Sequence, residues 1–128
     1  MPRIVIMSIQ NLLRIPYLKN SFKHAIIFVT TNPEYYDFGH TQFWQMNTAD
    51  NDTPIVSDLS IWALKQIIQT GQDYDTIYVC CDAGLSRSPA VAHFIAVHLH
   101  EFKQAAVMQK KYRFMNYELH LKLMREIP

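Results

Sequence analysis

The sequence predicts an α/β fold in which a mainly parallel central sheet is flanked by helices. Short apolar runs rich in β-branched residues alternate along the chain with longer stretches of helical patterning. Strands connected through helices pair in parallel, which favours helices on both faces of the sheet. The expected strands are residues 4–8, 25–30, 41–46 and 76–80, and the expected helices run from 57 or 58 to 71, from 88 to 100, from 102 to 112 and from 117 to 127.

Length and composition predict a single domain in a reducing compartment. The chain has 128 residues, of which 49% are hydrophobic and 18% are charged, as in an ordinary globular core. A formal net charge of +1 and the lack of a membrane-length apolar run give no reason to expect nucleic acid or a membrane as the partner. The two cysteines are neighbours rather than a disulfide framework, and no signal peptide is visible, so we expect a cytoplasmic protein.

Patterns within these elements predict where each lies in the fold. Residues 25–30 are apolar almost throughout, as in a strand buried on both faces, whereas residues 41–46 are expected nearer an edge. The helix over 88–100 is apolar on most sides, which predicts that it packs between the sheet and other helices. In the helix that ends at residue 71, the residues expected to be buried are Leu59, Trp62, Ile67 and Ile68. In the helix over 117–127 they are Leu119, Leu121, Leu123 and Met124.

The junction between residues 76–80 and the following helix predicts an anion-binding site. A strand that ends where a helix begins leaves the first amides of the helix unpaired, and the helix dipole adds positive potential there. Gly84 allows the loop to curl so that its N–H groups converge. Ser88 fits the helix N-cap, and Pro89 fits the first helical position.

Two side chains in this junction carry chemistry suited to a bound oxyanion. Cys81 begins the loop, where the positive field favours the thiolate over the thiol. Arg87 ends it with a planar guanidinium that binds two oxygens of a phosphate at once. The pattern predicts a nucleophile directed at a bound phosphate, and the alternative is a buried cysteine that only ends a core strand.

These residues resemble the phosphate-binding loop of the cysteine-dependent protein tyrosine and dual-specificity phosphatases. Cys81 is followed by five residues and then by Arg87 and Ser88, and residues 83–92 read AGLSRSPAVA, which is similar to the small dual-specificity-like members. The chain as a whole resembles a small, single-domain, bacterial-type member of the family. The resemblance implies that Ser88 hydrogen-bonds the sulfur, while the side chain of Asp82 is expected to face outward. It implies that the substrate phosphate is bound by Asp82, Ala83, Gly84, Leu85, Ser86 and Arg87.

Cys80 departs from the family pattern, which has a histidine immediately before the nucleophile. The change removes one partner that lowers the pKa of the thiol but leaves the amides, the helix dipole and Arg87. We therefore expect a less depressed pKa for Cys81 and not an inactive enzyme. A disulfide between the two cysteines would be strained, because adjacent Cα atoms lie only about 3.8 Å apart. Cys80 is expected to be a small apolar residue that ends a buried strand.

The resemblance also implies an aspartate, roughly thirty residues before the nucleophile, that acts as general acid. Asp50 and Asp52 lie in that region, and the loop over 50–54 is similar to the aspartate-containing loop of the bacterial-type members. That similarity favours Asp50 and leaves Asp52 as the alternative. Asp58 is more typical of a residue at a helix N-terminus. The non-catalytic interpretation is a turn whose aspartates bond only their own backbone.

Together these features predict a phosphatase acting on phosphotyrosine, and also on phosphoserine or phosphothreonine, through a phosphocysteine intermediate. In this scheme Cys81 attacks phosphorus, Arg87 clamps the phosphate, and Asp50 protonates the departing oxygen without a metal or other cofactor. The partner is then a phosphorylated protein. Two alternatives stay open: a catalytically silent phosphate-binding module, and a redox or sulfur-transfer enzyme that uses the pair Cys80 and Cys81.

Several other polar residues are assigned no role by the sequence. The sequence predicts no metal site at the histidines, because His93, His98 and His100 lack the i, i+4 spacing of a chelating pair and His120 is isolated. We expect these histidines to face solvent or to pack loosely. A basic cluster late in the chain is better explained by a solvated helix end than by a binding patch. Its members are Lys103, Lys110, Lys111 and Arg113. Residues 113–116 are faintly similar to a Pro-Asn element of the bacterial-type phosphatases but lack its proline.

Overall fold

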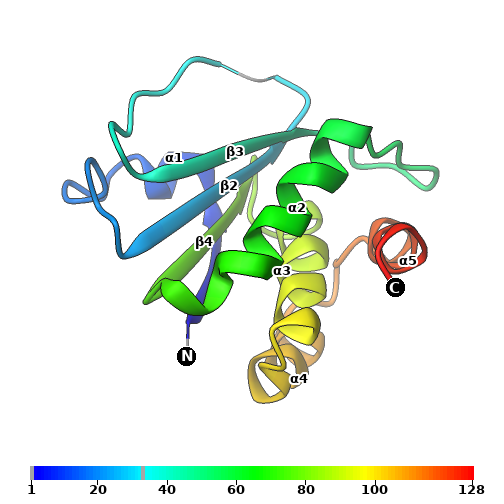
Figure 1. The fold of residues 1–128 in the computed structure, drawn as a ribbon. Helices are drawn as coiled ribbons and strands as arrows, with labels where there is room; N and C mark the ends of the chain where they lie inside the picture. Colours follow the sequence, from blue (N-terminus) through cyan, green and yellow to red (C-terminus); the bar gives the residue numbers. More distant parts are fainter. Residues whose placement is uncertain (1, 33) are drawn as a thin grey trace.

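The computed structural model describes residues 2–32 and 34–128 and has the predicted α/β architecture (Figure 1). Its elements are β1 (Arg3–Ser8), α1 (Ile9–Leu12), β2 (His24–Thr30), β3 (Gln42–Asn47), α2 (Asp58–Thr70), a 3-10 turn (Gly71–Asp73), β4 (Thr76–Cys81), α3 (Arg87–His98), α4 (Phe102–Lys111) and α5 (Tyr117–Glu126). Each strand and helix expected from the sequence is present, with bounds within two residues of those expected. None of the described helices is both long and apolar enough to cross a membrane.

The four strands form one parallel sheet in the order β1-β4-β2-β3. β4 therefore lies between β1 and β2, and β3 is at an edge, as expected. In the register of the sheet, Cys81 at the end of β4 is the partner of Ser8 on one side and of Val29 on the other. The carboxyl ends of three strands thus meet around Cys81, which is where α/β sheets bind their ligands.

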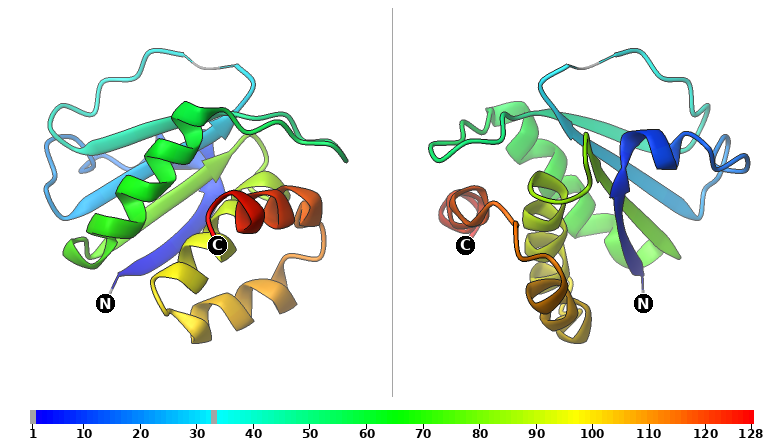
Figure 2. Two further views of the ribbon diagram at one scale, coloured as in Figure 1. Left: turned by 45° about the vertical axis from the view of Figure 1, so that its right-hand side comes forward. Right: turned by 180° about the vertical axis from the view of Figure 1, so that it is seen from behind.

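The helices α2 to α5 cover one face of this sheet, and α3 is at the centre of that layer (Figures 1 and 2). α3 contacts β1 and β4 on one side and α4 and α5 on the other. Its side chains from Ala90 to Ala96 are almost completely buried. The prediction that this apolar helix packs between the sheet and other helices is confirmed.

The second face of the sheet was also expected to be covered by helices, but loops cover much of it. Of the helices in residues 2–32 and 34–128, only the single turn of α1 lies there, and loop segments within those residues cover much of the rest (Figure 2). Phe28 of β2 sits under a group of aromatic rings from these loops and from β3. The rings around it belong to Tyr36, Phe38 and Phe43. Aromatic side chains bury large apolar areas, so a loop can shield the strands without a helix.

The buried stripe of α2 differs from the one expected. Ile67 is buried, but Leu59 and Trp62 are 71% and 53% exposed. The buried side continues instead through Leu64 and Ala63, at helical spacing from Ile67. α2 ends at Thr70 as expected from the glycine that follows, and a Cβ at that glycine would lie 2.7 Å from Leu99.

α5 packs against α3 through two histidines that the sequence suggested would be exposed or loosely packed. The rings of His93 and His120 meet edge to face, with centroids 4.6 Å apart. His93 is only 6% exposed, and burial lowers the pKa of both rings. Leu119 and Leu123 of α5 are fully buried, whereas Leu121 is 42% exposed. This packing fixes the N-terminus of α5 beside the loop that follows β4.

Candidate functional site

The loop between β4 and α3 folds tightly against the end of β1. Gly84 adopts a φ of +73°, a conformation that side chains disfavour. A Cβ at Gly84 would lie 2.8 Å from the carbonyl carbon of Met7 and from the nitrogen of Ser8. The glycine is therefore required both by the backbone conformation and by the close approach of a neighbouring strand. This confirms that Gly84 curls the loop.

The substitution Gly84→Ala is expected to destabilise the protein by about 1–3 kcal/mol, because the positive φ and the contact with rigid β1 backbone add strain together. Urea unfolding followed by circular dichroism measures the change. Gly71→Ala is the matched control, because its new methyl would meet only the flexible end of the Leu99 side chain. Equal destabilisation by the two substitutions would contradict a special role for the backbone at residue 84.

Cys81 lies at the base of this loop, where donors converge on its sulfur. The amide of Gly84 donates to Sγ at 3.2 Å, and the hydroxyl of Ser88 is 3.1 Å from it. Burial of Cys81 opposes ionisation, but hydrogen bonds from Ser88 and from the amides of Ser88, Gly84 and Ser86 outweigh it, so the pKa of the thiol is lowered. The thiol of Cys81 therefore ionises more readily than an unperturbed cysteine, although the residue is only 2% exposed.

Ser88 occupies this position because α3 begins earlier than expected. Arg87 is the first residue of the helix and Ser86 is its N-cap, without a side-chain cap bond. The prediction of Ser88 as N-cap and Pro89 as first helical residue was therefore wrong. The first turn directs its amides and the hydroxyl of Ser88 at the sulfur, which replaces the usual side-chain cap.

We expect Ser88→Ala to raise the pKa of Cys81 and to slow its alkylation at neutral pH, because the substitution removes a hydrogen bond that favours the thiolate. The rate of iodoacetamide labelling, followed by mass spectrometry across a pH series, gives the midpoint directly. Ser60→Ala, at a buried serine of α2 that hydrogen-bonds to Ser57 and not to the sulfur, is the control. An unchanged midpoint in Ser88→Ala would show that this hydroxyl does not stabilise the thiolate.

Cys80 faces the opposite side of the sheet from Cys81. Its side chain is completely buried among the apolar residues of the second face, whereas Cys81 belongs to the helix-side core. Burial is the largest cause of a strongly raised pKa for Cys80, with the nearby charge of Cys81 adding to it. Both cysteines are free. Cys80 is thus a small apolar residue at the end of a buried strand, as expected.

Arg87 is a buried cation held by two acceptors. Its Nη1 donates to the carbonyl oxygen of Thr48 at 3.0 Å, and its Nη2 donates to Oδ2 of Asp82 at 2.9 Å. The other oxygen of Asp82 accepts from Thr30 Oγ1 at 3.1 Å. The expectation that the Asp82 side chain faces outward was therefore only half right: it is 54% exposed, but it bridges β2 to the guanidinium.

Asp50 reaches the same loop from the segment after β3. One oxygen of its carboxylate accepts from Ser86 Oγ and from Asn116 Nδ2, both at 2.8 Å. Asn116 also donates from Nδ2 to the carbonyl of Asn51, and its backbone amide donates to the carbonyl of Ser86. Asp52 is exposed, and no such bond to its carboxylate is found among the described residues. Asp50 is thus attached to the loop and to α5 together.

An open hollow of about 440 Å³ lies over these contacts. The residues that line it come from the Asp50 loop, the loop after β4 and the start of α5: Asp50, Asn51, Asp52, Ser86, Phe114, Met115, Asn116, Tyr117 and Glu118. The rings of Phe114 and Tyr117 are 76% and 58% exposed at its rim. The hollow meets the loop after β4 at Ser86, and its rim offers exposed aromatic surface to a bound side chain.

Ala83 and Leu85 are exposed in this loop, as is Asp82, whose carboxylate makes the contacts with Arg87 and Thr30 described above. The structure brings Cys81, Ser86 and Ser88 together with Asp50 through hydrogen bonds, and Arg87 begins the adjoining helix. The sequence predicted each of these residues for the site.

Asn116 is the site residue that the sequence analysis set aside. Its Oδ1 accepts from the amide of Leu119, so it is the N-cap of α5, while its other groups reach Asp50 and Ser86. An asparagine directly before a helical stretch is a recognisable N-cap signal. That signal locates a helix start but does not tell which loop lies beside it. No pattern in the sequence indicated that the backbone carbonyl of Thr48 would accept a hydrogen bond from Arg87.

Comparison with known proteins supports the fold. No family model and no curated protein sequence matches the chain. A solved structure does match, that of a human "tyrosine phosphatase-like serine/threonine/tyrosine-interacting protein", with a TM-score of 0.53 and 16% sequence identity. The match covers 80% of this chain and 74% of the human one. The chain therefore has a phosphatase-like α/β fold, as the resemblance of its loop implied.

Proposed function

We propose that this protein is a cysteine-dependent phosphatase that hydrolyses phosphotyrosine, and also phosphoserine or phosphothreonine, in a protein substrate. The observation that carries the proposal is the sulfur of Cys81, which is held by the hydroxyl and amide of Ser88 and by the amides of Gly84 and Ser86, so that the pKa of the thiol is lowered despite burial. A stabilised thiolate at the base of an amide-lined loop is suited to attack on phosphorus. Arg87, at the start of α3, adds a fixed positive charge.

In the first step the thiolate of Cys81 forms a bond to phosphorus while the ester P–O bond breaks. Asp50 gives its proton to the departing oxygen, which would otherwise leave as a poor alkoxide or phenoxide. The loop amides and Arg87 hold the three equatorial oxygens, whose negative charge would be costly in an apolar site. Because these donors are fixed before substrate arrives, they need little reorganisation during the reaction.

In the second step water attacks the phosphocysteine and Asp50 accepts its proton. The S–P bond breaks, inorganic phosphate is released, and the electron pair returns to Cys81 as thiolate. The hydroxyl of Ser88, 3.1 Å from the sulfur, stabilises that leaving thiolate. The contact between Asp50 and Ser86 supports a role for Asp50 rather than Asp52, because it holds this carboxylate next to the loop in which phosphate would bind.

A second candidate is a phosphate-binding module without turnover. It is favoured by the ion pair between Arg87 and Asp82, which already occupies one side of the guanidinium. The human protein with the similar fold is described as phosphatase-like and as an interacting protein. A redox or sulfur-transfer reaction through Cys80 has less support, since Cys80 and Cys81 point to opposite faces of the sheet.

The deciding experiment is hydrolysis of 4-nitrophenyl phosphate by the wild type in reducing buffer with chelator, followed by phosphopeptides. We expect turnover of the aryl phosphate, release of phosphate from a phosphotyrosine peptide, and inhibition by orthovanadate, which resembles the transferring phosphoryl group. Measured affinity for a phosphotyrosine peptide without any turnover would overturn the phosphatase proposal and establish the binding module. Parallel peptides with phosphoserine and phosphothreonine determine the breadth of specificity.

We expect Asp50→Asn to lower kcat about 10²–10³-fold for phenyl phosphate, because the amide cannot protonate a poor leaving group. The loss should be much smaller for a substrate with an acidic leaving phenol, which needs little protonation. Asp52→Asn is the matched control and should change neither rate by more than about twofold. A larger loss in Asp52→Asn than in Asp50→Asn would transfer the general-acid role to Asp52.

A further inference from the structure

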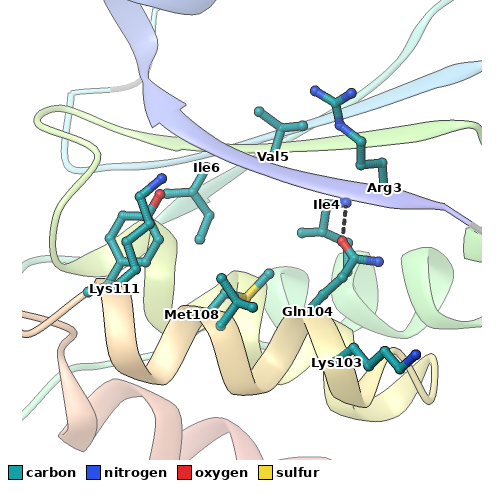
Figure 3. A pocket seen from close by; sticks show the side chains of 10 residues that line it. Arg3, Ile4, Val5, Ile6, Lys103, Gln104, Met108 and Lys111 are labelled. Atoms are coloured by element: carbon teal, nitrogen blue, oxygen red, sulfur yellow. Dashed lines mark hydrogen bonds between the residues drawn. The ribbon is translucent and has the colours of Figure 1, made fainter.

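A second hollow, of about 400 Å³, lies between strand β1 and helix α4 (Figure 3). Its floor is apolar and comes from both elements, with Ile4 and Ile6 on the strand and Val107, Met108 and Tyr112 on or just after the helix. Val107 is 61% exposed. We call this hollow the β1–α4 groove. The site described above is formed by other residues, so the groove is not part of it.

The groove runs along an unpaired edge of the sheet. Over residues 2–32 and 34–128, β1 pairs only with β4. The amide of Arg3 donates to the carbonyl of Asp75, just before β4, whereas the amide of Ile4 points the other way and donates to the side chain of Gln104. Residues of a strand alternate in this respect, so Ile6 also directs its N–H and C=O away from β4. An exposed edge of this kind is a template for another strand.

A side-chain amide already occupies one position of that edge. Oε1 of Gln104 accepts from the amide of Ile4 at 2.8 Å, and its Nε2 donates to the carbonyl of Pro2 at 2.9 Å. Figure 3 shows the first of these bonds at one end of the groove. An added parallel strand would make this pair of bonds with the N–H and the C=O of one residue. Gln104 thus mimics a bound peptide at Pro2 and Ile4, and the next equivalent position, at Ile4 and Ile6, faces the open groove.

Charge identifies the kind of segment that fits. Three cations and no acidic residue line the groove: Arg3, Lys103 and Lys111. Lys103 and Arg3 lie toward the Gln104 end and Lys111 toward the Ile6 end (Figure 3). None of the three forms an ion pair in the described part of the chain. Three cations on one groove are a concentrated positive patch in a chain whose net charge is only +1.

We infer that the β1–α4 groove binds an extended, acidic segment of a partner protein as an added β-strand. The segment bonds to the N–H of Ile6 and to the neighbouring carbonyls. Alternate residues on its α4-facing side place an apolar side chain over Ile6 and Val107, between two carboxylates directed to Lys103 and Lys111. A second copy of β1 is a poorer occupant, because its own Arg3 would meet the same cations. The inference does not depend on the proposed phosphatase function.

The groove also has a defined relation to the loop after β4. Ser8 is the register partner of Cys81, and Ile6 lies two residues before it, about 7 Å along the strand. A segment bound along β1 therefore extends toward the phosphate-binding loop. A partner captured there would bring its neighbouring residues close to Cys81, which raises their local concentration.

The test uses a fluorescein-labelled peptide, Gly-Thr-Glu-Thr-Val-Thr-Glu-Thr-Gly, which carries Glu, Val and Glu on one face of the extended strand, and the chain of 128 residues. We expect saturable binding by anisotropy, with amide shifts in a ¹⁵N spectrum that centre on Ile6, Val107 and Lys111. Binding should weaken about tenfold in the double variant Arg3→Glu/Lys111→Glu. The control, Lys65→Glu/Arg125→Glu, changes the net charge equally at exposed positions outside the groove and should bind as the wild type does.

A second peptide, N-methylated at its threonines, tests the strand geometry because it has lost the donors on the edge that would face β1. We expect it to bind at least about tenfold more weakly than the parent peptide. Undetectable binding, shifts outside the groove, or equal weakening by the two double variants would each overturn the inference. Equal affinity for the methylated peptide would also overturn it. Sedimentation of the free chain as a dimer that Arg3→Glu disrupts would assign the groove to a second copy instead.

Discussion

Replacing Cys81 with serine is expected to abolish hydrolysis of 4-nitrophenyl phosphate, with a loss on the order of 10⁴-fold or more in kcat. The hydrogen bonds from Ser88 and the loop amides are sufficient to lower the pKa of a thiol, but a serine hydroxyl ionises so much less readily that it stays neutral. The amides and Arg87 are unchanged, so phosphate binding should be retained within a few-fold. Steady-state kinetics and calorimetry with a phosphotyrosine peptide measure the two effects separately.

Cys80→Ala is the matched control for this substitution. Cys80 lies one residue away on the same strand but on the other face of the sheet, so we expect most of the turnover to persist. Loss of activity in Cys80→Ala with unchanged folding would support the redox alternative. Wild-type turnover in Cys81→Ser would exclude the phosphocysteine intermediate, whatever the behaviour of Cys80.

The parts of the molecule that the sequence predicted well are those in which local chemistry determines structure. The strand, loop and helix around Cys81 follow from an apolar run, a glycine and a second apolar run, and the contact of Gly84 with β1 is the physical reason for that glycine. The alternation of strands and helices likewise led to the parallel sheet. In each case neighbouring residues carry the information.

The features that escaped prediction depend on contacts between distant segments. Asn116 joins Asp50 across 66 residues of sequence, and nothing near Asn116 indicates which loop it will meet. The packing on the second face of the sheet also escaped prediction, because rings that surround Phe28 come from a segment without periodicity. Leu59 and Trp62 of α2 were expected to be buried but are exposed. Large hydrophobic side chains occur on both sides of this helix, so hydrophobicity alone does not identify its buried side.

The second large effect is expected at Arg87, where lysine keeps the charge but loses the planar fork. In Arg87→Lys we expect kcat/KM for aryl phosphate to fall about 10²–10³-fold, since one ammonium cannot bind two phosphate oxygens and replace the separate bonds to Thr48 and Asp82. Asp82→Asn removes the ion pair but keeps an acceptor for Nη2, so its loss should be much smaller if Asp82 only orients the guanidinium.

Thermal unfolding of both variants separates a chemical defect from a structural one, because Arg87 is 8% exposed and its removal also disturbs buried acceptors. Loss of activity with a nearly unchanged melting temperature in Arg87→Lys would place the defect in phosphate stabilisation. A kcat/KM within about threefold of wild type would show that a point charge is sufficient there. If Asp82→Asn were instead more active than wild type, the ion pair would be a competitor that phosphate must displace, and the free chain would be the less active form.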